Sequence, residues 1–166
     1  MNITLIGMPS CGKSTIGVVA AKQLGLDFVD CDLLIQRREG RKLKDIIRTD
    51  GLDAFMAIEE EVNSSLDVKD SVISPGGSVV LSEKAMKHLK EISFIIYLKV
   101  SYSTMCRRIG DPVKRGVVMR PGLTLSDLYR QREPLYAKYA DLVIEERGLY
   151  MNEIVDLVVK QYETSE

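Results

Sequence analysis

The sequence contains few of the residues that build cross-linked or metal-bound frameworks. It has one histidine and three cysteines, Cys11, Cys31 and Cys106, with no C-x-x-C pair among them. An odd number of cysteines without such a pair suggests neither a disulfide scaffold nor a zinc site. Cys11 precedes a predicted helix, where the pKa of a thiol can fall. The simpler interpretation is a small residue that its loop tolerates.

Long apolar runs are also missing from the 166 residues. No run reaches the ~18–20 residues that a membrane span needs. Residues 1–4 lack the basic start and the cleavage site of a signal peptide, so we expect a cytoplasmic protein. The net charge is −1, which favours neither a nucleic acid nor a membrane surface as a partner. Repeats, linkers and low-complexity tracts are absent, so we expect one domain over residues 1–166.

One short motif near the start of the chain carries the strongest chemical signal. Residues 7–14 read G-x-x-x-x-G-K-S, between a predicted buried strand at residues 3–6 and a predicted helix at residues 16–24. In this setting the loop N–H groups and the positive end of the helix bind phosphate, Lys13 reaches the β- and γ-phosphates, and the Ser14 hydroxyl suits Mg²⁺. The motif predicts that the nucleotide is bound by Gly7, Pro9, Ser10, Cys11, Gly12, Lys13, Ser14 and Thr15.

Strand-like and helical patterns alternate along the whole chain. Further strands are predicted near residues 27–30, 71–74, 92–98 and 141–144, with helical patterns between them. Strands joined by helical crossovers form a parallel sheet covered on both faces. The prediction is therefore an α/β three-layer sandwich around a five-stranded parallel sheet.

Polar and glycine-rich residues follow two of these predicted strands. Asp30 and Asp32 end the second strand, and Gly76-Gly77 follows the third. The carboxyl ends of parallel strands are where such sheets bind ligands. One carboxylate near Mg²⁺ and another that accepts a hydroxyl proton would serve phosphoryl transfer, although one aspartate could instead cap the next helix. The glycines form either a tight turn or a place where a ligand approaches the backbone closely.

A basic segment lies in the last third of the chain. Residues 107–132 hold seven basic side chains against Asp111 and Asp127, and the part from 110 to 124 has three glycines, two prolines and little periodicity. A nucleic-acid patch is one interpretation, but aromatic interleaving is missing. A lid that closes over phosphates also explains the glycines and prolines, so we predict a mobile lid at about residues 110–124.

Taken together, these motifs resemble the shikimate kinases, a family of P-loop kinases of the nucleoside-monophosphate-kinase-like type. The order and spacing of the motifs match the family over nearly the whole chain. The matching segments are residues 28–32 (F-x-D-x-D), 53–61 (around F-R-x-x-E), 76–77 (G-G-G), 120–121 (R-P) and 132–141 (R-x-P-L-Y…A-D).

For the phosphate donor, the resemblance implies ATP with Mg²⁺. Lys13 would contact the phosphates, Asp30 would support Mg²⁺ beside Ser14, and Arg108 would lie near the adenine. Arg120 would come down onto the phosphates with the lid, which makes Lys13 and Arg120 catalytic residues.

For the phosphate acceptor, the resemblance implies shikimate, a small hydroxylated acid. Asp32 would hold the substrate hydroxyls and act as the catalytic base, while Glu59 would support the pocket. The backbone of Gly76 and Gly77 would touch the substrate ring, and Arg132 would pair with its carboxylate. We expect a monomer that needs neither nucleic acid nor membrane.

Three positions depart from the family pattern. Met56 stands where the family has a second arginine for the substrate carboxylate, Ser78 replaces the third glycine, and Ser10-Cys11 replaces the usual Gly-Ser of the loop. Met56 leaves open a kinase for another small hydroxylated metabolite (polyol, sugar acid or hydroxy amino acid). A separate alternative is a nucleotide-binding regulator without catalysis.

Overall fold

The computed structural model, which describes residues 1–165, contains one parallel sheet. The strand order is β2-β3-β1-β4-β5, and every neighbouring pair is parallel. The predicted α/β fold with a five-stranded parallel sheet is therefore confirmed. The strands are β1 (Asn2–Ile6), β2 (Asp27–Asp30), β3 (Ser71–Ser74), β4 (Ser93–Lys99) and β5 (Leu142–Glu145).

The central strand β1 explains why the strand pattern could be recognised in the sequence. All five of its residues are buried, because β3 lies on one side of it and β4 on the other. Ile3 pairs with Val72 of β3 and with Phe94 of β4. A strand with neighbours on both edges and helices on both faces has no solvent-facing position, so Ile3, Leu5 and Ile6 are apolar, and the side chains of the buried Asn2 and Thr4 are hydrogen-bonded.

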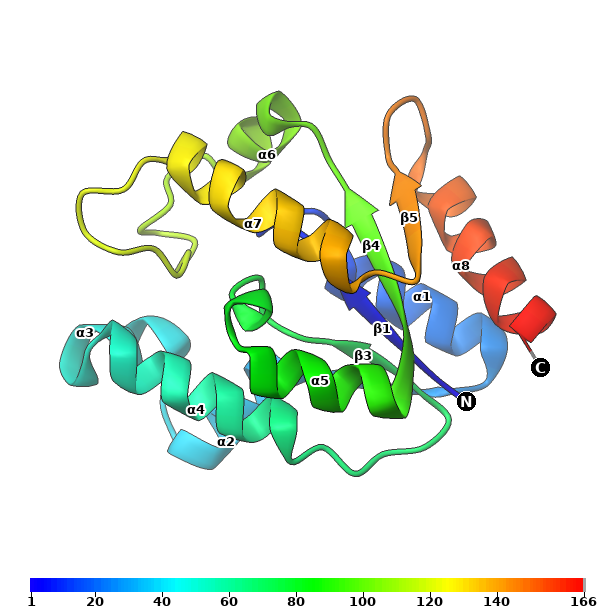
Figure 1. Cartoon of the computed structure of the whole chain (residues 1–166), viewed down its shortest axis with the longest axis horizontal. Helices are drawn as coiled ribbons and strands as arrows, with labels where there is room; N and C mark the ends of the chain where they lie inside the picture. The colour runs from blue at the N-terminus through cyan, green and yellow to red at the C-terminus, as the bar shows by residue number, and fades with distance from the viewer. Residues whose placement is uncertain (166) are drawn as a thin grey trace.

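Helices cover both faces of the sheet (Figure 1). α1 (Lys13–Leu24) packs beside α8 (Met151–Ser165) on one face. α5 (Glu83–Ile92) and α7 (Leu125–Tyr139) pack against β4 on the other face. The predicted three layers are thus present. α6 (Tyr102–Ile109) follows β4 and contacts α7.

The start of α7 is fixed by a reciprocal cap. The Thr124 hydroxyl accepts from the backbone N–H of Asp127, and the Asp127 carboxylate accepts from the N–H of Thr124. Such a box satisfies two N–H groups that a helix start otherwise leaves unpaired. The cap marks the end of the predicted lid, because residues 110–124 form turns and loop without helix or strand.

Three short helices form a separate lobe at the β2 edge. They are α2 (Cys31–Glu39), α3 (Leu43–Asp50) and α4 (Leu52–Ser64). The breaks between them fall at two glycines, Gly40 with φ 63° and Gly51 with φ 88°, where other residues would be strained. An apolar cluster of its own, separate from the main core, holds the lobe together: Ile35, Ile46, Phe55 and Val62.

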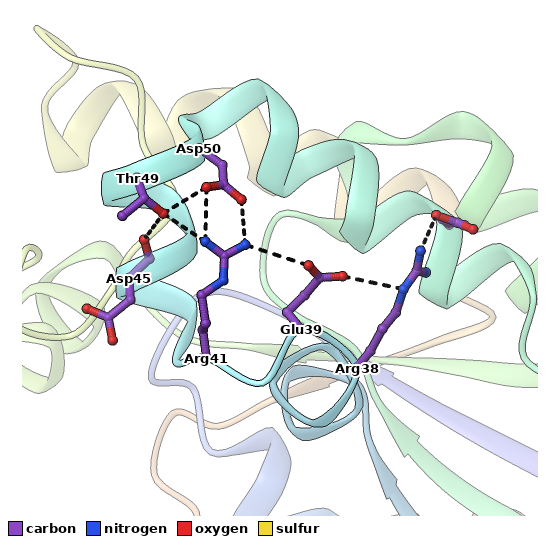
Figure 2. Close-up of polar contacts among 7 residues, drawn as sticks. Arg38, Glu39, Arg41, Asp45, Thr49 and Asp50 are labelled. Carbon is purple, nitrogen blue, oxygen red and sulfur yellow. Dashed lines mark hydrogen bonds and ion pairs between the residues drawn. The ribbon is translucent and has the colours of Figure 1, made fainter.

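An ion-pair network ties the outside of this lobe together (Figure 2). The Arg41 guanidinium forms two hydrogen bonds with the Asp50 carboxylate, at 3.0 and 2.5 Å. Glu39 lies between Arg41 and Arg38, and Arg38 reaches Glu61 on α4 at 2.8 Å. Exposed pairs contribute little singly, but this network links the ends of α2 and α3 to α4.

Helix α1 lies close against β2 at one point. A Cβ atom added to Gly17 would stand 2.6 Å from Cε2 of Phe28, far inside contact distance. Gly17 therefore lets α1, the helix that follows the phosphate-binding loop at residues 7–14 (the P-loop), rest directly on the strand that ends in Asp30. This contact sets the spacing between the two elements.

Two smaller features complete the fold. A 3₁₀ turn at Val79–Leu81 follows the glycine pair after β3, and the sequence pattern did not indicate it.

Among the described helices, none has both the length and the apolar character required to cross a membrane.

Candidate active site

A cavity of about 580 Å³ opens at the carboxyl ends of the strands. The P-loop, the turn after β3, the α2–α4 lobe and the lid all contribute to its wall. Its size suits a small-molecule site. Most of the site residues expected from the sequence line it: Pro9, Ser10, Gly12, Lys13, Ser14, Thr15, Asp32, Glu59, Gly76, Gly77, Arg108 and Arg132.

The P-loop is shaped by its tight packing against the sheet. Gly7 has φ 155°, and a Cβ atom there would stand 2.7 Å from the carbonyl oxygen of Leu98. Gly12 and Ser10 also have positive φ, at 101° and 62°. Residues that turn the chain this way point successive N–H groups to one side, which creates an anion-binding concavity. Gly7 itself lies beneath the loop, outside the cavity wall.

The side chain of Lys13 folds back onto its own loop. Its ammonium group donates to the carbonyl oxygens of Gly7 at 2.9 Å and Met8 at 3.0 Å. The Cys11 thiol lies 3.7 Å from the same nitrogen, yet burial outweighs Lys13 and raises the pKa of Cys11. Cys11 is therefore a neutral packing residue, in agreement with the simpler interpretation of the sequence.

Asp30 caps helix α2, one of the functions that the sequence offered, and its second oxygen contacts Ser14, so a role beside Mg²⁺ stays a prediction. One oxygen caps α2 by accepting from the N–H groups of Asp32 at 3.0 Å and Leu33 at 3.2 Å. The other oxygen accepts from the Ser14 hydroxyl at 3.1 Å, and the Ser74 hydroxyl lies 3.4 Å from that of Ser14. A carboxylate and hydroxyls are hard oxygen ligands, the set that suits Mg²⁺.

No dedicated metal cage accompanies these oxygens. Residues 1–165 contain no group of three His, Cys, Asp or Glu side chains that could hold a metal. Mg²⁺ in kinases is typically held by one or two protein oxygens together with the phosphates of the nucleotide. The Ser14–Asp30 pair fits that arrangement.

Asp32 projects into the cavity beyond the cap. Burial, and to a smaller extent the charge of Asp30, raise its pKa to about 6, although Lys13 works in the opposite direction. A carboxylate with this pKa is mostly ionised at neutral pH and is a stronger base than an exposed aspartate. These properties suit a group that accepts a hydroxyl proton.

Glu59 is a second buried carboxyl in the wall. Only 3% of its surface is exposed, and burial raises its pKa to about 7. Ser78 donates a 2.5 Å hydrogen bond to Oε2. Within residues 1–165, Oε1 has no hydrogen-bond partner.

The glycine pair after β3 is explained by packing. A Cβ atom on Gly76 would stand 2.4 Å from Oε1 of Glu59, and one on Gly77 would stand 3.2 Å from Cδ of Pro9. The carbonyl of Gly77 also accepts from the Tyr136 hydroxyl. The turn thus packs against both Glu59 and the P-loop. Contact of the two glycines with a substrate stays a prediction.

Arg132 is a buried cation on α7. Only 2% of its surface is exposed, and Nη2 donates to the carbonyl oxygen of Val118 in the lid. In the described part of the chain, Nε and Nη1 have no partner. The residue lines the cavity, so its guanidinium places a positive charge in the cavity wall, where it suits an anionic group.

The structure places two lid arginines differently relative to the cavity, and the contact of Arg120 with the phosphates on lid closure stays a prediction. Arg120 lies outside the wall, because its guanidinium pairs with Asp53 on α4 at 3.0 Å. Arg115 lines the cavity instead, and its Nη2 donates to the carbonyl oxygen of Arg108 at 3.2 Å. The basic segment in the sequence contained both residues, but its pattern gave no means of choosing between them.

Met56 does not line the main cavity. It borders a small cavity of about 50 Å³ under the lid, together with Leu52, Val118 and Leu123. Its neighbours are mainly apolar, so the side chain packs α4 against the lid. Met56, which stands where the family pattern has an arginine, is therefore part of the surface on which the lid packs in this structure.

A P-loop at the end of a parallel sheet, an acid after the next strand along the chain and an arginine-bearing lid define a P-loop phosphotransferase. The model of the shikimate kinase family matches residues 9–163. The chain belongs to this family of phosphotransferases with an alcohol acceptor.

Individual relatives agree with the family model. The chain is 36% identical to the shikimate kinase of Thermodesulfovibrio yellowstonii, over 98% of this chain and 95% of that protein. The solved shikimate kinase of Acinetobacter baumannii in complex with shikimate has a TM-score of 0.86 at 26% identity, covering 99% and 94% of the two chains. That of Aquifex aeolicus also has 0.86, at 29% identity and 99% and 98% coverage.

Proposed function

We propose that this protein transfers the γ-phosphate of ATP to a hydroxyl group of shikimate. Arg132 is the observation that carries the proposal: a buried guanidinium with two unsatisfied donors belongs to the wall of a cavity that Lys13 and Asp32 also line. That arrangement suits an acceptor with both an anionic group and a hydroxyl. The relatives support shikimate over another hydroxylated metabolite, and the catalytic residues argue against a silent regulator.

On the acceptor side, three side chains have distinct tasks. Arg132 binds the substrate carboxylate through its guanidinium, whose planar arrangement of donors matches two carboxylate oxygens. Asp32 accepts the proton of the attacking hydroxyl as its oxygen forms the new bond to phosphorus. The bond from phosphorus to the β-phosphate oxygen breaks, and ADP leaves. Glu59 supports the pocket beside Gly76, whose backbone with that of Gly77 faces the substrate ring.

On the donor side, Lys13 exchanges the carbonyl oxygens of Gly7 and Met8 for phosphate oxygens. Ser14 and Asp30 would hold Mg²⁺, which when bound neutralises charge on the phosphates. The P-loop N–H groups orient the phosphates and Arg108 lies beside the adenine. The donor therefore binds on one side of Asp32 and the acceptor on the other.

The lid, residues 110–124, completes the site when it closes. Arg115 is the lid residue placed to reach the transferred phosphoryl group, where a fixed cation stabilises the transition-state charge. Closure also keeps water from taking the place of the acceptor hydroxyl. Arg120 then secures the lid against α4 through Asp53.

We further propose a cytoplasmic, monomeric, single-domain enzyme. The three cysteines are free thiols, which suits a reducing compartment. Donor and acceptor residues all come from one chain. Three of the arginines in the basic segment line the cavity (Arg108, Arg115 and Arg132), so this charge is directed at small anions and not at nucleic acid or membrane.

Coupled ADP-release assays test the proposed reaction. We expect ADP release that depends on ATP, Mg²⁺ and shikimate together, and that is much slower with shikimate methyl ester, which lacks the carboxylate charge. A panel of polyols, sugar acids and hydroxy amino acids serves as the comparison. The proposal fails if protein that demonstrably binds ATP releases no ADP with shikimate, or if another acceptor in the panel is used more efficiently.

A further inference from the structure

Glu146 is an acidic residue held rigidly beside the P-loop. It directly follows β5, and its N–H donates to the carbonyl oxygen of Lys99 at 3.0 Å, which continues the pairing with β4. Its own carbonyl accepts from the N–H of Leu149 at 3.1 Å. Only 8% of its surface is exposed. The backbone under this carboxylate is therefore fixed by the sheet.

The side chain of Glu146 holds Arg108 from α6. Its Oε2 accepts from Nη1 of Arg108 at 2.9 Å, and the same nitrogen donates to the carbonyl oxygen of Cys11 at 3.3 Å. In the described residues Oε1 has no hydrogen-bond partner, so Glu146 makes one strong contact and that contact is with Arg108. The guanidinium is thus tied to both the P-loop and the end of β5.

Arg108 separates two cavities. It lines the main cavity and also a second one of about 250 Å³ behind the P-loop. Ile16, Leu149, Met151 and Ile154 supply apolar surface to the second cavity, and Glu146 lines it too. A guanidinium held in place beside apolar walls offers a flat cationic face on which a planar heterocycle stacks.

We propose that Glu146 is a positioning residue for the phosphate donor: it holds the Arg108 guanidinium against the nucleoside part of ATP. The inference rests on the proposed use of ATP. The Arg108 side chain is 40% exposed, so without Glu146 it would sample other rotamers and bind the nucleoside only after being ordered again. The triphosphate, which the P-loop binds, does not depend on this contact.

A double-mutant cycle measured by calorimetry tests the proposal, with ADP and inorganic tripolyphosphate as the two probes. Glu146→Ala should weaken ADP binding roughly tenfold, the loss expected for one charge-assisted hydrogen bond. Tripolyphosphate binding should stay within about twofold. In an Arg108→Ala background, Glu146→Ala should add no further loss for ADP, because the residue acts through Arg108.

Two further variants sharpen the comparison. Glu146→Gln keeps an oxygen within reach of Arg108 and should restore part of the ADP affinity. Glu145→Ala removes the neighbouring, exposed carboxylate on β5 and should leave both probes unaffected, as the matched control. Thermal unfolding of each variant establishes that it is folded at the assay temperature.

The outcomes separate the inference from the proposed function. Three results would overturn the role of Glu146 while leaving the ATP-dependent reaction intact. Glu146→Ala could weaken ADP and tripolyphosphate binding equally, could weaken ADP binding fully in the Arg108→Ala background, or could leave ADP affinity unchanged. If the unmodified protein binds tripolyphosphate but not ADP, the proposed donor is wrong and the inference falls with it.

Discussion

The Ser78 hydroxyl donates a 2.5 Å hydrogen bond to Oε2 of Glu59 and thereby joins the turn after β3 to helix α4. Ser78 stands where the family pattern has a third glycine. Glycine has no side-chain donor, so the serine supplies a partner to a carboxyl that is almost fully buried. A buried carboxyl without a donor is costly, and this bond offsets part of that cost.

The raised pKa of Glu59, from 4.5 to about 7, predicts how stability depends on pH. Between these values the unfolded chain has lost the proton that the folded chain keeps. The free energy of unfolding should therefore fall as pH rises from about 4.5 to 7, by an amount on the order of 1–3 kcal/mol. Glu59→Gln should flatten this slope.

Urea unfolding at pH 5 and pH 7.5 measures this difference. Glu91→Gln, at an exposed position on α5, is the control and should keep the slope of the unmodified protein. The interpretation of Glu59 is wrong if Glu59→Gln and Glu91→Gln behave alike.

Asp32→Asn tests the catalytic base. We expect kcat to fall by about 10²–10⁴ while ADP binding is retained, because general-base catalysis contributes in that range. In the unmodified enzyme kcat/KM should rise with pH through about 6, the pKa of Asp32, since the ionised form is the active one. Asp27→Asn, at the exposed start of β2, should match the unmodified rate. A variant of Asp32 that retains full turnover would remove this residue from the mechanism.

The two lid arginines should differ in their effect on turnover. Arg115 lines the cavity, so Arg115→Ala should lower kcat by about 10²-fold or more, as expected for a cation that stabilises transition-state charge. Arg120→Ala breaks only an exposed pair with Asp53, worth ~0–1 kcal/mol, and should change kcat/KM by less than about fivefold. Steady-state kinetics of both variants measure this difference. If Arg120→Ala lowers kcat more than Arg115→Ala does, Arg120 is the lid residue that contacts the phosphates.

Arg132→Lys keeps a positive charge but loses the planar fork. We expect KM for shikimate to rise about 10- to 150-fold, the equivalent of one lost charge-assisted contact. KM for ATP should change little, since Arg132 is on the acceptor side. Shikimate methyl ester should bind the variant about as poorly as it binds the unmodified enzyme. If the ester loses as much affinity on mutation as shikimate does, Arg132 shapes the pocket and does not bind the carboxylate.

The sequence was sufficient for features that depend on neighbouring residues. The buried strand β1 and the strands at residues 27–30 and 71–74 follow from local patterns, and the structure has each of them where expected. Asp32 and Arg132 could be proposed because strand ends and family motifs marked them.

Features that depend on distant contacts could not be read from the sequence. The lid has no periodicity, so nothing in it shows that Arg115 faces the cavity while Arg120 pairs with Asp53. Arg108 and Glu146 are 38 residues apart and meet only because α6 and β5 end beside the P-loop. Such contacts are a property of the assembled fold.

The close contact between Gly17 and Phe28 has a consequence for how the enzyme tolerates change. A side chain at position 17 would have to displace the Phe28 ring, two residues before Asp30, so the packing of α1 on β2 beside the carboxylates depends on this glycine. Position 17 faces no ligand, and a harmful variant there would act on the site through this packing alone.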